Sequence, residues 1–239
     1  MADLLLIPGA DGRAWSWHRL VPELAARGHR GIPVELPLEP AATLDDYRDA
    51  ALAAVAAVPD PGRLTVVGQS LGAYTAPLLV DRLAVERIVL INPMIPAPGE
   101  TAGEFWDATG QEQARVAAAL KHGHPTEFDL LTGFFHDVPE DVTAEAMASG
   151  GVAELDGVFA QPWPLSRWPE VRTEVILAEG DRFFPLEFQR RVIAERLPDP
   201  ALHVIPGGHL VALADPVTVA DTLDVIVRSP TASEGAPRG

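Results

Sequence analysis

Six short apolar runs, each followed by a turn signal and then a segment with helical periodicity, constrain the fold of this chain more than any other feature. Short runs rich in Val, Ile and Leu and separated by helices are typical of buried parallel strands. The pattern predicts an α/β protein with a doubly wound, mostly parallel sheet of about six strands. The runs are Leu4–Ile7, Gly31–Leu36, Leu64–Val67, Arg87–Ile91, Thr173–Ala178 and Ala201–Ile205.

The segments between these runs carry recognisable helix signals. Thr43 is expected to cap a helix that stops before Pro59, because Asp46 stands three residues after it as in a capping box. Three more helices are expected to cover the sheet, over Gly72 to Arg82, Leu186 to Leu197 and Val217 to Arg228.

A long insertion separates the fourth run from the fifth and concentrates Phe and Trp. A structureless loop of that length is uncommon in a compact domain. We therefore expect a helical cap over residues 96–172, inserted after the fourth strand into a core of residues 1–95 and 173–228. The last residues, 229–239, are small and polar, and we expect them to be disordered.

Composition excludes several classes of function for the 239-residue chain. Its formal net charge of -16 argues against binding to nucleic acid or to an anionic membrane surface, since both need a basic patch. The chain has no cysteine, which excludes disulfides, thiol catalysis and thiolate metal sites. Its first residues lack a basic segment, and no apolar run approaches the roughly 18 residues of a membrane span. We expect a cytoplasmic protein that does not enter the membrane.

The third run leads into a serine that stands between two glycines. Gly68-Gln69-Ser70-Leu71-Gly72 has the pattern G-x-S-x-G, with a strand expected before it and a helix after it. In this context the glycines permit a sharp, strained turn that exposes the hydroxyl. The amide of Leu71 would then lie beside that hydroxyl as a donor to an oxyanion. An ordinary Gly-Ser turn is the alternative.

A serine hydroxyl becomes a useful nucleophile only when an oriented base removes its proton. Asp181 follows the fifth run and His209 follows the sixth, and parallel strands bring their carboxyl ends to one edge of a sheet. We therefore expect a catalytic triad of Ser70, Asp181 and His209. Glu179 is a weaker candidate than Asp181 for the acid of the triad, because its side chain would have to extend from nearer the strand. A turn-forming aspartate and a surface histidine are the alternative interpretations.

The second oxyanion donor is expected in the loop after the first run, "IPGADGRAW". The amide of Ala10 is our choice, paired with that of Leu71.

Four segments carry a family resemblance: "LIPGADGRAWSWHRLVPELAARGH", "VVGQSLGAY", "EGDRFFPLEFQRRV" and "PGGHLVALADPVTVADTL". They resemble the α/β-hydrolase superfamily, over nearly the whole chain, and within it the branch of plant methylesterases and hydroxynitrile lyases. The resemblance implies Ser70 as nucleophile, His209 as base, Asp181 as its orienting acid, and Ala10 and Leu71 as oxyanion amides.

Two departures from the lyases of that branch favour ester hydrolysis. Those lyases carry a threonine at the position of Gly9 and a lysine at the position of Leu210. Cyanohydrin cleavage needs positive charge near the leaving cyanide, which an apolar leucine does not provide.

Aromatic residues in and near the insertion are candidates for an apolar substrate cavity, with core packing as the equally strong alternative. They are Trp106, Phe134, Phe135, Phe183 and Phe184. The polar residues His122, His124, His136 and Asp137 are expected to be solvated rather than to bind a metal, since no third ligand is placed beside the histidine pair.

The sequence therefore predicts a serine hydrolase that cleaves a carboxylic ester or related acyl substrate with an apolar portion. Its substrate is a small molecule, and the chemistry needs neither cofactor nor metal. A ligand sensor on the same fold is one alternative, and a lyase or acyltransferase of a biosynthetic pathway is another. The sequence carries no signal of the oligomeric state.

Overall fold

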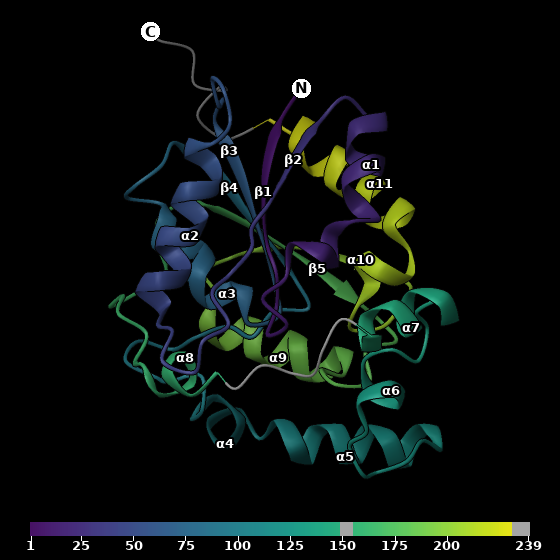
Figure 1. Ribbon diagram of the computed structural model, residues 1–239. Helices are drawn as coiled ribbons and strands as arrows, with labels where there is room; N and C mark the ends of the chain where they lie inside the picture. The colour runs from purple at the N-terminus through teal and green to yellow at the C-terminus, as the bar shows by residue number, and fades with distance from the viewer. Residues whose placement is uncertain (149–154, 231–239) are drawn as a thin grey trace, which may run out of the picture.

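A six-stranded sheet in which every strand runs parallel to its neighbours forms the centre of the protein (Figure 1). The structure, a computed structural model, describes residues 1–148 and 155–230. The strand order is β2-β1-β3-β4-β5-β6, which confirms the predicted parallel α/β sheet. The strands are β1 (Asp3–Ile7), β2 (Arg30–Pro33), β3 (Leu64–Gln69), β4 (Val85–Ile91), β5 (Arg172–Ala178) and β6 (Ala201–Ile205).

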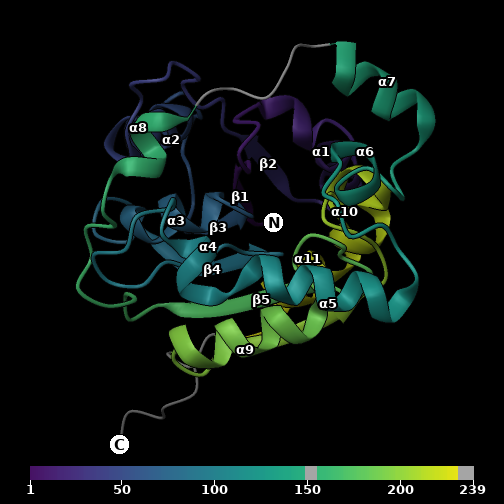
Figure 2. The same ribbon diagram turned by 90° about the horizontal axis from the view of Figure 1, so that it is seen from below.

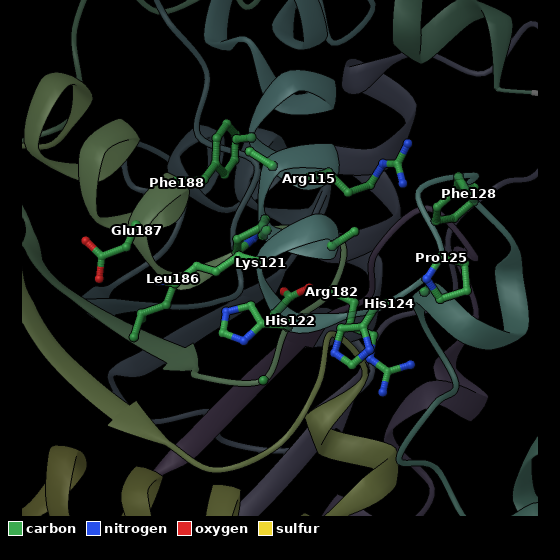
Figure 3. Close-up of a pocket in the computed structure, with 18 of the residues that line it drawn as sticks. Arg115, Lys121, His122, His124, Pro125, Phe128, Arg182, Leu186, Glu187 and Phe188 are labelled. Atoms are coloured by element: carbon green, nitrogen blue, oxygen red, sulfur yellow. The ribbon is translucent and has the colours of Figure 1, made fainter.

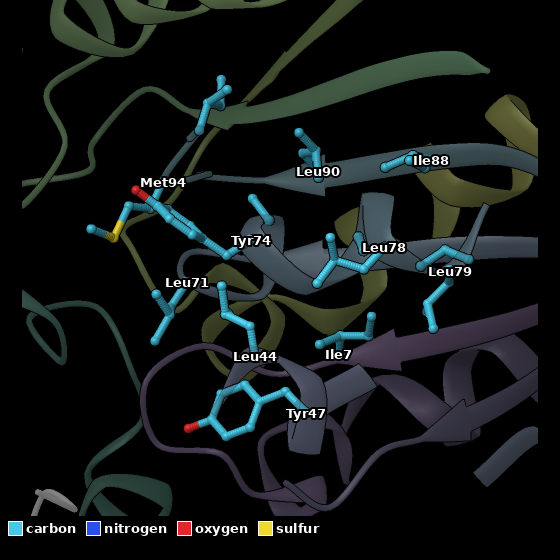
Figure 4. Close-up of a cluster of buried hydrophobic side chains, with 14 of the residues drawn as sticks. Ile7, Leu44, Tyr47, Leu71, Tyr74, Leu78, Leu79, Ile88, Leu90 and Met94 are labelled. Carbon is cyan, nitrogen blue, oxygen red and sulfur yellow. The ribbon is translucent and has the colours of Figure 1, made fainter. Parts of the chain in front are cut away.

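Helices cover both faces of the sheet because neighbouring residues of a strand point to opposite sides. Leu4 and Leu6 of β1 belong to one apolar core, and Leu5 and Ile7 belong to the other. The first core is closed by α1 (Leu20–Ala26), α10 (Val211–Ala214) and α11 (Pro216–Arg228). The second, part of which Figure 4 shows, is closed by α2 (Leu44–Ala56), α3 (Gly72–Thr75) and α9 (Leu186–Arg196).

The predicted start of α2 is confirmed in detail. The Thr43 hydroxyl accepts a hydrogen bond from the Asp46 amide, and the Asp46 carboxylate accepts one from the Thr43 amide. This reciprocal pair satisfies two amides that the first turn of a helix leaves without partners.

Two expected boundaries are wrong, and a proline lies at each. The helix expected over Gly72 to Arg82 is split into α3 and a 3-10 helix, Ala76–Leu79, because Pro77 has no amide hydrogen to continue the α-helical pattern. The strand expected to reach Leu36 ends at Pro33.

The insertion between β4 and β5 consists of short helices in the described part of the chain. Figures 1 and 2 show them spread over the end of the molecule at which the strands terminate, with α8 beside α2 on one side and α7 on the other. They are α4 (Phe105–Thr109), α5 (Gln111–His122), α6 (Leu130–Gly133), α7 (Glu140–Ala148) and α8 (Asp156–Ala160). The assignment of residues 96–172 to a separate cap stays a prediction. We expected a disordered tail over residues 229–239. Of these, residues 231–239 lie outside the described part of the structure.

None of the described helices combines the length and the apolar character needed to cross a membrane.

Candidate active site

Three predicted site residues meet at the carboxyl edge of the sheet. Ser70 follows β3, Asp181 follows β5 and His209 follows β6, so the parallel topology brings together residues that are far apart in the chain. The His209 Nε2 atom lies 3.1 Å from Ser70 Oγ, and His209 Nδ1 lies 2.8 Å from Asp181 Oδ2. The hydroxyl, the imidazole and the carboxylate therefore form one chain of hydrogen bonds.

The surroundings of these three hydrogen-bonded side chains favour one tautomer of the His209 imidazole. Asp181 and His209 are only 4% and 2% exposed, whereas Ser70 is partly exposed and open to a reactant. The other carboxylate oxygen of Asp181 accepts the amides of Phe183 and Phe184, each at 2.8 Å. With Asp181 held in place as an acceptor, Nδ1 of His209 carries the proton and Nε2 is left to accept the serine hydroxyl. Glu179, the competing carboxylate, is exposed.

The backbone at Ser70 is strained in the way that the motif predicts. Ser70 has a φ of +50°, in the left-handed region that a side chain rarely adopts. A Cβ atom at Gly72 would lie 2.7 Å from the Pro8 carbonyl oxygen, and one at Gly68 would lie 2.8 Å from the Gly72 carbonyl oxygen. Only glycine allows these approaches between the turn, the helix and β1.

The loop after β1 passes directly beside the serine. A Cβ atom at Gly9 would lie 3.3 Å from Ser70 Cβ and 3.9 Å from Ser70 Oγ. Ala10 follows in this loop, and Leu71 precedes α3. Among the described residues, neither the Ala10 amide nor the Leu71 amide has a hydrogen-bond partner. Neither amide is thus engaged by an acceptor of the described residues, and their part in an oxyanion hole stays a prediction.

A carboxyl group stands next in the same loop. Loss of surrounding water raises the pKa of Asp11, while a hydrogen bond from the Ser16 hydroxyl acts in the opposite direction. Asp11 as a residue is nevertheless exposed, so its side chain keeps contact with solvent.

Four of the five predicted aromatic residues lie together, and three of them surround the imidazole. The His209 ring centroid lies 4.8 Å from that of Phe134 and 5.3 Å from those of Phe183 and Phe184. Trp106 packs against Phe183 with ring centroids 5.7 Å apart. Phe135 is separate, since it packs against a small cluster of Val138, Val142 and Leu213. Whether this array contacts a substrate stays a prediction.

A cavity of about 790 Å³ opens between α5, α9 and the loop of Asp181 (Figure 3). Its volume lies within the range of small-molecule sites, roughly 300–1,000 Å³. His122 and His124 line it, as does Asp181, but neither Ser70 nor His209 is among the described residues of its wall. The cavity therefore lies behind the acid of the site rather than above the serine. No group of three or more His, Asp or Glu side chains within residues 1–148 and 155–230 is arranged to hold a metal ion.

Comparison with known proteins agrees with the fold. A model of the alpha/beta hydrolase family matches residues 4–222. The chain belongs to this family.

Relatives of this alpha/beta hydrolase include plant enzymes. It is similar to Methylesterase 3 of Arabidopsis thaliana, with 25% identity over 245 residues that cover 89% of this chain and 91% of that protein. It is also similar to Alpha-hydroxynitrile lyase of the same plant, with 22% identity over 249 residues, 93% of this chain and 95% of that protein. Among solved structures, a pyrethroid hydrolase from Sphingobium faniae JZ-2 superposes with a TM-score of 0.73 and 20% identity, covering 96% and 98% of the two chains. The predicted family and branch are confirmed.

Two side-chain amides of this alpha/beta hydrolase hold the backbone of His209, and the sequence analysis missed both. Asn92, fully buried after β4, donates to the carbonyl oxygens of Gly208 and His209 at 3.1 Å and accepts the Ala178 amide at 2.8 Å. Gln69 donates to the same His209 carbonyl at 3.2 Å. The ends of three strands are thus joined to the loop that carries the imidazole.

Proposed function

We propose that this protein is a serine hydrolase that cleaves the carboxylic ester, or a related acyl bond, of a small molecule with an apolar portion. The observation that carries the proposal is the hydrogen-bonded chain from Ser70 Oγ through His209 to Asp181, at 3.1 Å and 2.8 Å. This is the arrangement that activates a serine hydroxyl for nucleophilic attack.

In the acylation step, Ser70 Oγ attacks the ester carbonyl carbon while His209 Nε2 takes the hydroxyl proton. The carbonyl oxygen gains the negative charge and is bound by the amides of Ala10 and Leu71, each worth on the order of 3 kcal/mol of transition-state stabilisation. The tetrahedral intermediate then collapses, and the imidazolium returns the proton to the departing alkoxide. The alcohol leaves and the acyl group stays on Ser70.

Deacylation repeats these roles with water. His209 removes a proton from a water molecule as its oxygen attacks the acyl carbon, and the same two amides bind the second oxyanion. When this intermediate collapses, the proton goes to Ser70 Oγ and the acid is released. Asp181 stays ionised in both steps, because its role is to hold the Nδ1–H tautomer and to stabilise the imidazolium.

The aromatic rings around the imidazole support an apolar substrate. Phe134 and Phe183 are partly exposed, pack against His209 and come from the inserted region and from the loop after β5. A substrate acyl or alcohol group beside them would be removed from water, which favours its binding. The similarity to Methylesterase 3 agrees with ester cleavage.

One relative is a hydroxynitrile lyase, and a contact of this chain argues against that chemistry. Leu210, which follows the catalytic histidine, packs with Val138 and Leu213 in an apolar cluster. No cation therefore stands at this position to bind a leaving cyanide.

Turnover of aryl esters with graded acyl length tests the proposal. The native protein is expected to hydrolyse at least part of the series, and Ser70→Ala is expected to be inactive with an unchanged melting temperature. Failure of the folded native protein to cleave any ester of a broad panel would contradict the proposal. Release of cyanide from mandelonitrile would instead favour the lyase.

A further inference from the structure

A short segment of the inserted region, residues 134–138 after α6, contacts the loop of His209 at several points. The ring of Phe134 lies against the imidazole, with centroids 4.8 Å apart. Val138 packs against Leu213, which follows the same loop. Asp137, between them, contacts the backbone of the loop itself. The expectation that His136 and Asp137 are solvated is therefore wrong, since their side chains are only 13% and 24% exposed.

The contact of Asp137 is a short hydrogen bond to the residue that precedes the catalytic histidine. Its Oδ2 atom accepts the Gly208 amide at 2.5 Å. Bonds of this kind, from an amide to a carboxylate, are among the stronger hydrogen bonds of proteins. A Cβ atom at Gly208 would lie 2.6 Å from both Asp137 Oδ1 and His136 Nε2, so a larger residue here would displace these side chains.

Gly208, the residue before His209, forms hydrogen bonds both with a residue at the end of a sheet strand and with a residue of the inserted region. Asn92, at the end of β4, donates to the Gly208 carbonyl, whereas Asp137 accepts from the Gly208 amide. Gly207, one residue earlier, accepts the amide of Gly180 at 2.9 Å. Asp137 is thus the contact by which the inserted region fixes the start of the loop, while the remaining polar contacts come from the core.

We propose that Asp137 is a positioning residue, through which the inserted region sets the orientation of the His209 imidazole. The inference rests on the proposed function, because it assigns Asp137 to the alignment of Nε2 with the serine hydroxyl. Asp137 itself touches neither the substrate nor the reacting atoms. Its loss would free the Gly208 amide and leave the Gly207–Gly208 peptide held through the Gly207 carbonyl oxygen, which accepts the Gly180 amide. Displacements on the order of 1 Å at a catalytic group can cost about a hundredfold in rate.

A set of variants separates positioning from general stability. Asp137→Ala is expected to lower kcat between about tenfold and a hundredfold, with KM for a short aryl ester changed less than about twofold. Asp137→Asn keeps an oxygen that can accept the Gly208 amide and is expected to recover most of this loss. Asp129→Ala is the matched control, because this carboxylate of the same region caps α6 through the Thr132 amide and does not contact the loop.

Nitrogen NMR of the imidazole ring provides a readout that does not depend on activity. The native protein and Asp129→Ala are expected to show His209 as the single Nδ1–H tautomer, and Asp137→Ala is expected to show a mixture of tautomers. If no ester is cleaved by the native protein, the proposed function fails while this comparison still tests Asp137.

If Asp137→Ala does not fold, a second variant, Gly208→Ala, tests the same contact. Gly208→Ala must displace Asp137, because the added methyl group would occupy the position 2.6 Å from its carboxylate, and it is expected to lower kcat to a similar extent. The proposal would be overturned if folded Asp137→Ala kept the kcat and the single tautomer of Asp129→Ala. It would equally be overturned if Gly208→Ala retained native kcat, or if Asp137→Asn lost as much activity as Asp137→Ala.

Discussion

The sheet and the inserted helices bury their apolar side chains to very different extents. Every residue of β1 and of β3 is buried. The inserted region instead leaves large apolar side chains open to solvent, with 69%, 45%, 47% and 42% exposure at Leu120, Phe128, Leu131 and Met147. Burial of apolar surface is the main source of folding free energy. The central strands are therefore packed on both faces, whereas the inserted region keeps part of its apolar surface in solvent, as does the edge strand β6 at Leu202 and Val204.

The candidate site combines both regions. Ser70, Asp181 and His209 follow β3, β5 and β6, so the sheet sets where their backbones lie. Phe134 and Asp137 reach the imidazole from the inserted region. Changes in the two regions should therefore have separable effects on reaction rate, stability and substrate preference.

The largest effect is expected at the acid of the site. Asp181→Asn keeps the shape of the side chain but no longer enforces the Nδ1–H tautomer, and kcat should fall on the order of 10⁴-fold. Glu179→Gln, two residues earlier and exposed, should leave kcat within a few-fold of the native value. Steady-state hydrolysis of an aryl ester measures both. Equal losses of kcat in the two variants would mean that Asp181 is not the specific acid that orients His209.

A matched pair of leucines tests where the stability resides. Leu177→Ala in β5 empties a fully buried position and should lower the free energy of unfolding by about 2–5 kcal/mol. Leu120→Ala in α5, at 69% exposure, should change it by less than about 0.5 kcal/mol. Urea denaturation compares them, and similar losses would contradict the difference drawn between sheet and insertion.

Two neighbouring phenylalanines of the inserted region should differ in what they control. Phe134→Ala removes the ring beside His209 and should lower kcat/KM for long-acyl esters by about tenfold relative to acetate esters. Phe135→Ala, which loosens the cluster around Val138, should lower the melting temperature and keep the native acyl preference. The same change of preference in both variants would remove Phe134 from the substrate site.

The smallest effect is expected from pH, through His136. Burial lowers the pKa of this imidazole below its ordinary value of 6.5, although the Asp137 carboxylate acts in the opposite direction. The unfolded chain therefore binds the proton more readily, and the free energy of unfolding should fall as the pH drops below about 6.5. His136→Gln should reduce this fall by less than about 1 kcal/mol, measured by urea denaturation at pH 8 and pH 5. An identical pH dependence in both proteins would show that His136 protonates equally in the folded and unfolded states.

Most of the sheet could be predicted because a parallel strand buried on both faces has to be an apolar run. The errors were local. The predicted helix breaks at Pro77, which has no amide hydrogen, and β2 ends at Pro33 although the Val34 amide still donates to the Leu6 carbonyl oxygen. The inserted region was predicted only as helical, since its short helices depend on contacts with distant segments rather than on a strong pattern of their own.

The residues of the candidate site also fall into those that the sequence could predict and those that it could not. Ser70, Asp181 and His209 each follow a strand in a local motif, so the sequence alone could bring them together. Asn92 and Asp137 carry no such signal, because their partners lie 117 and 71 residues away in the chain. A polar residue that will fix a backbone loop looks, in the sequence, like one that faces solvent.

Reaction with a fluorophosphonate, followed by mass spectrometry of the intact protein and of its peptides, tests the central claim most directly. One adduct per chain is expected on Ser70. It should form in the native protein and in Glu179→Gln, be absent in Ser70→Ala and form far more slowly in His209→Ala. An unlabelled native protein, or an adduct at Ser70 that forms equally fast without His209, would contradict the claim.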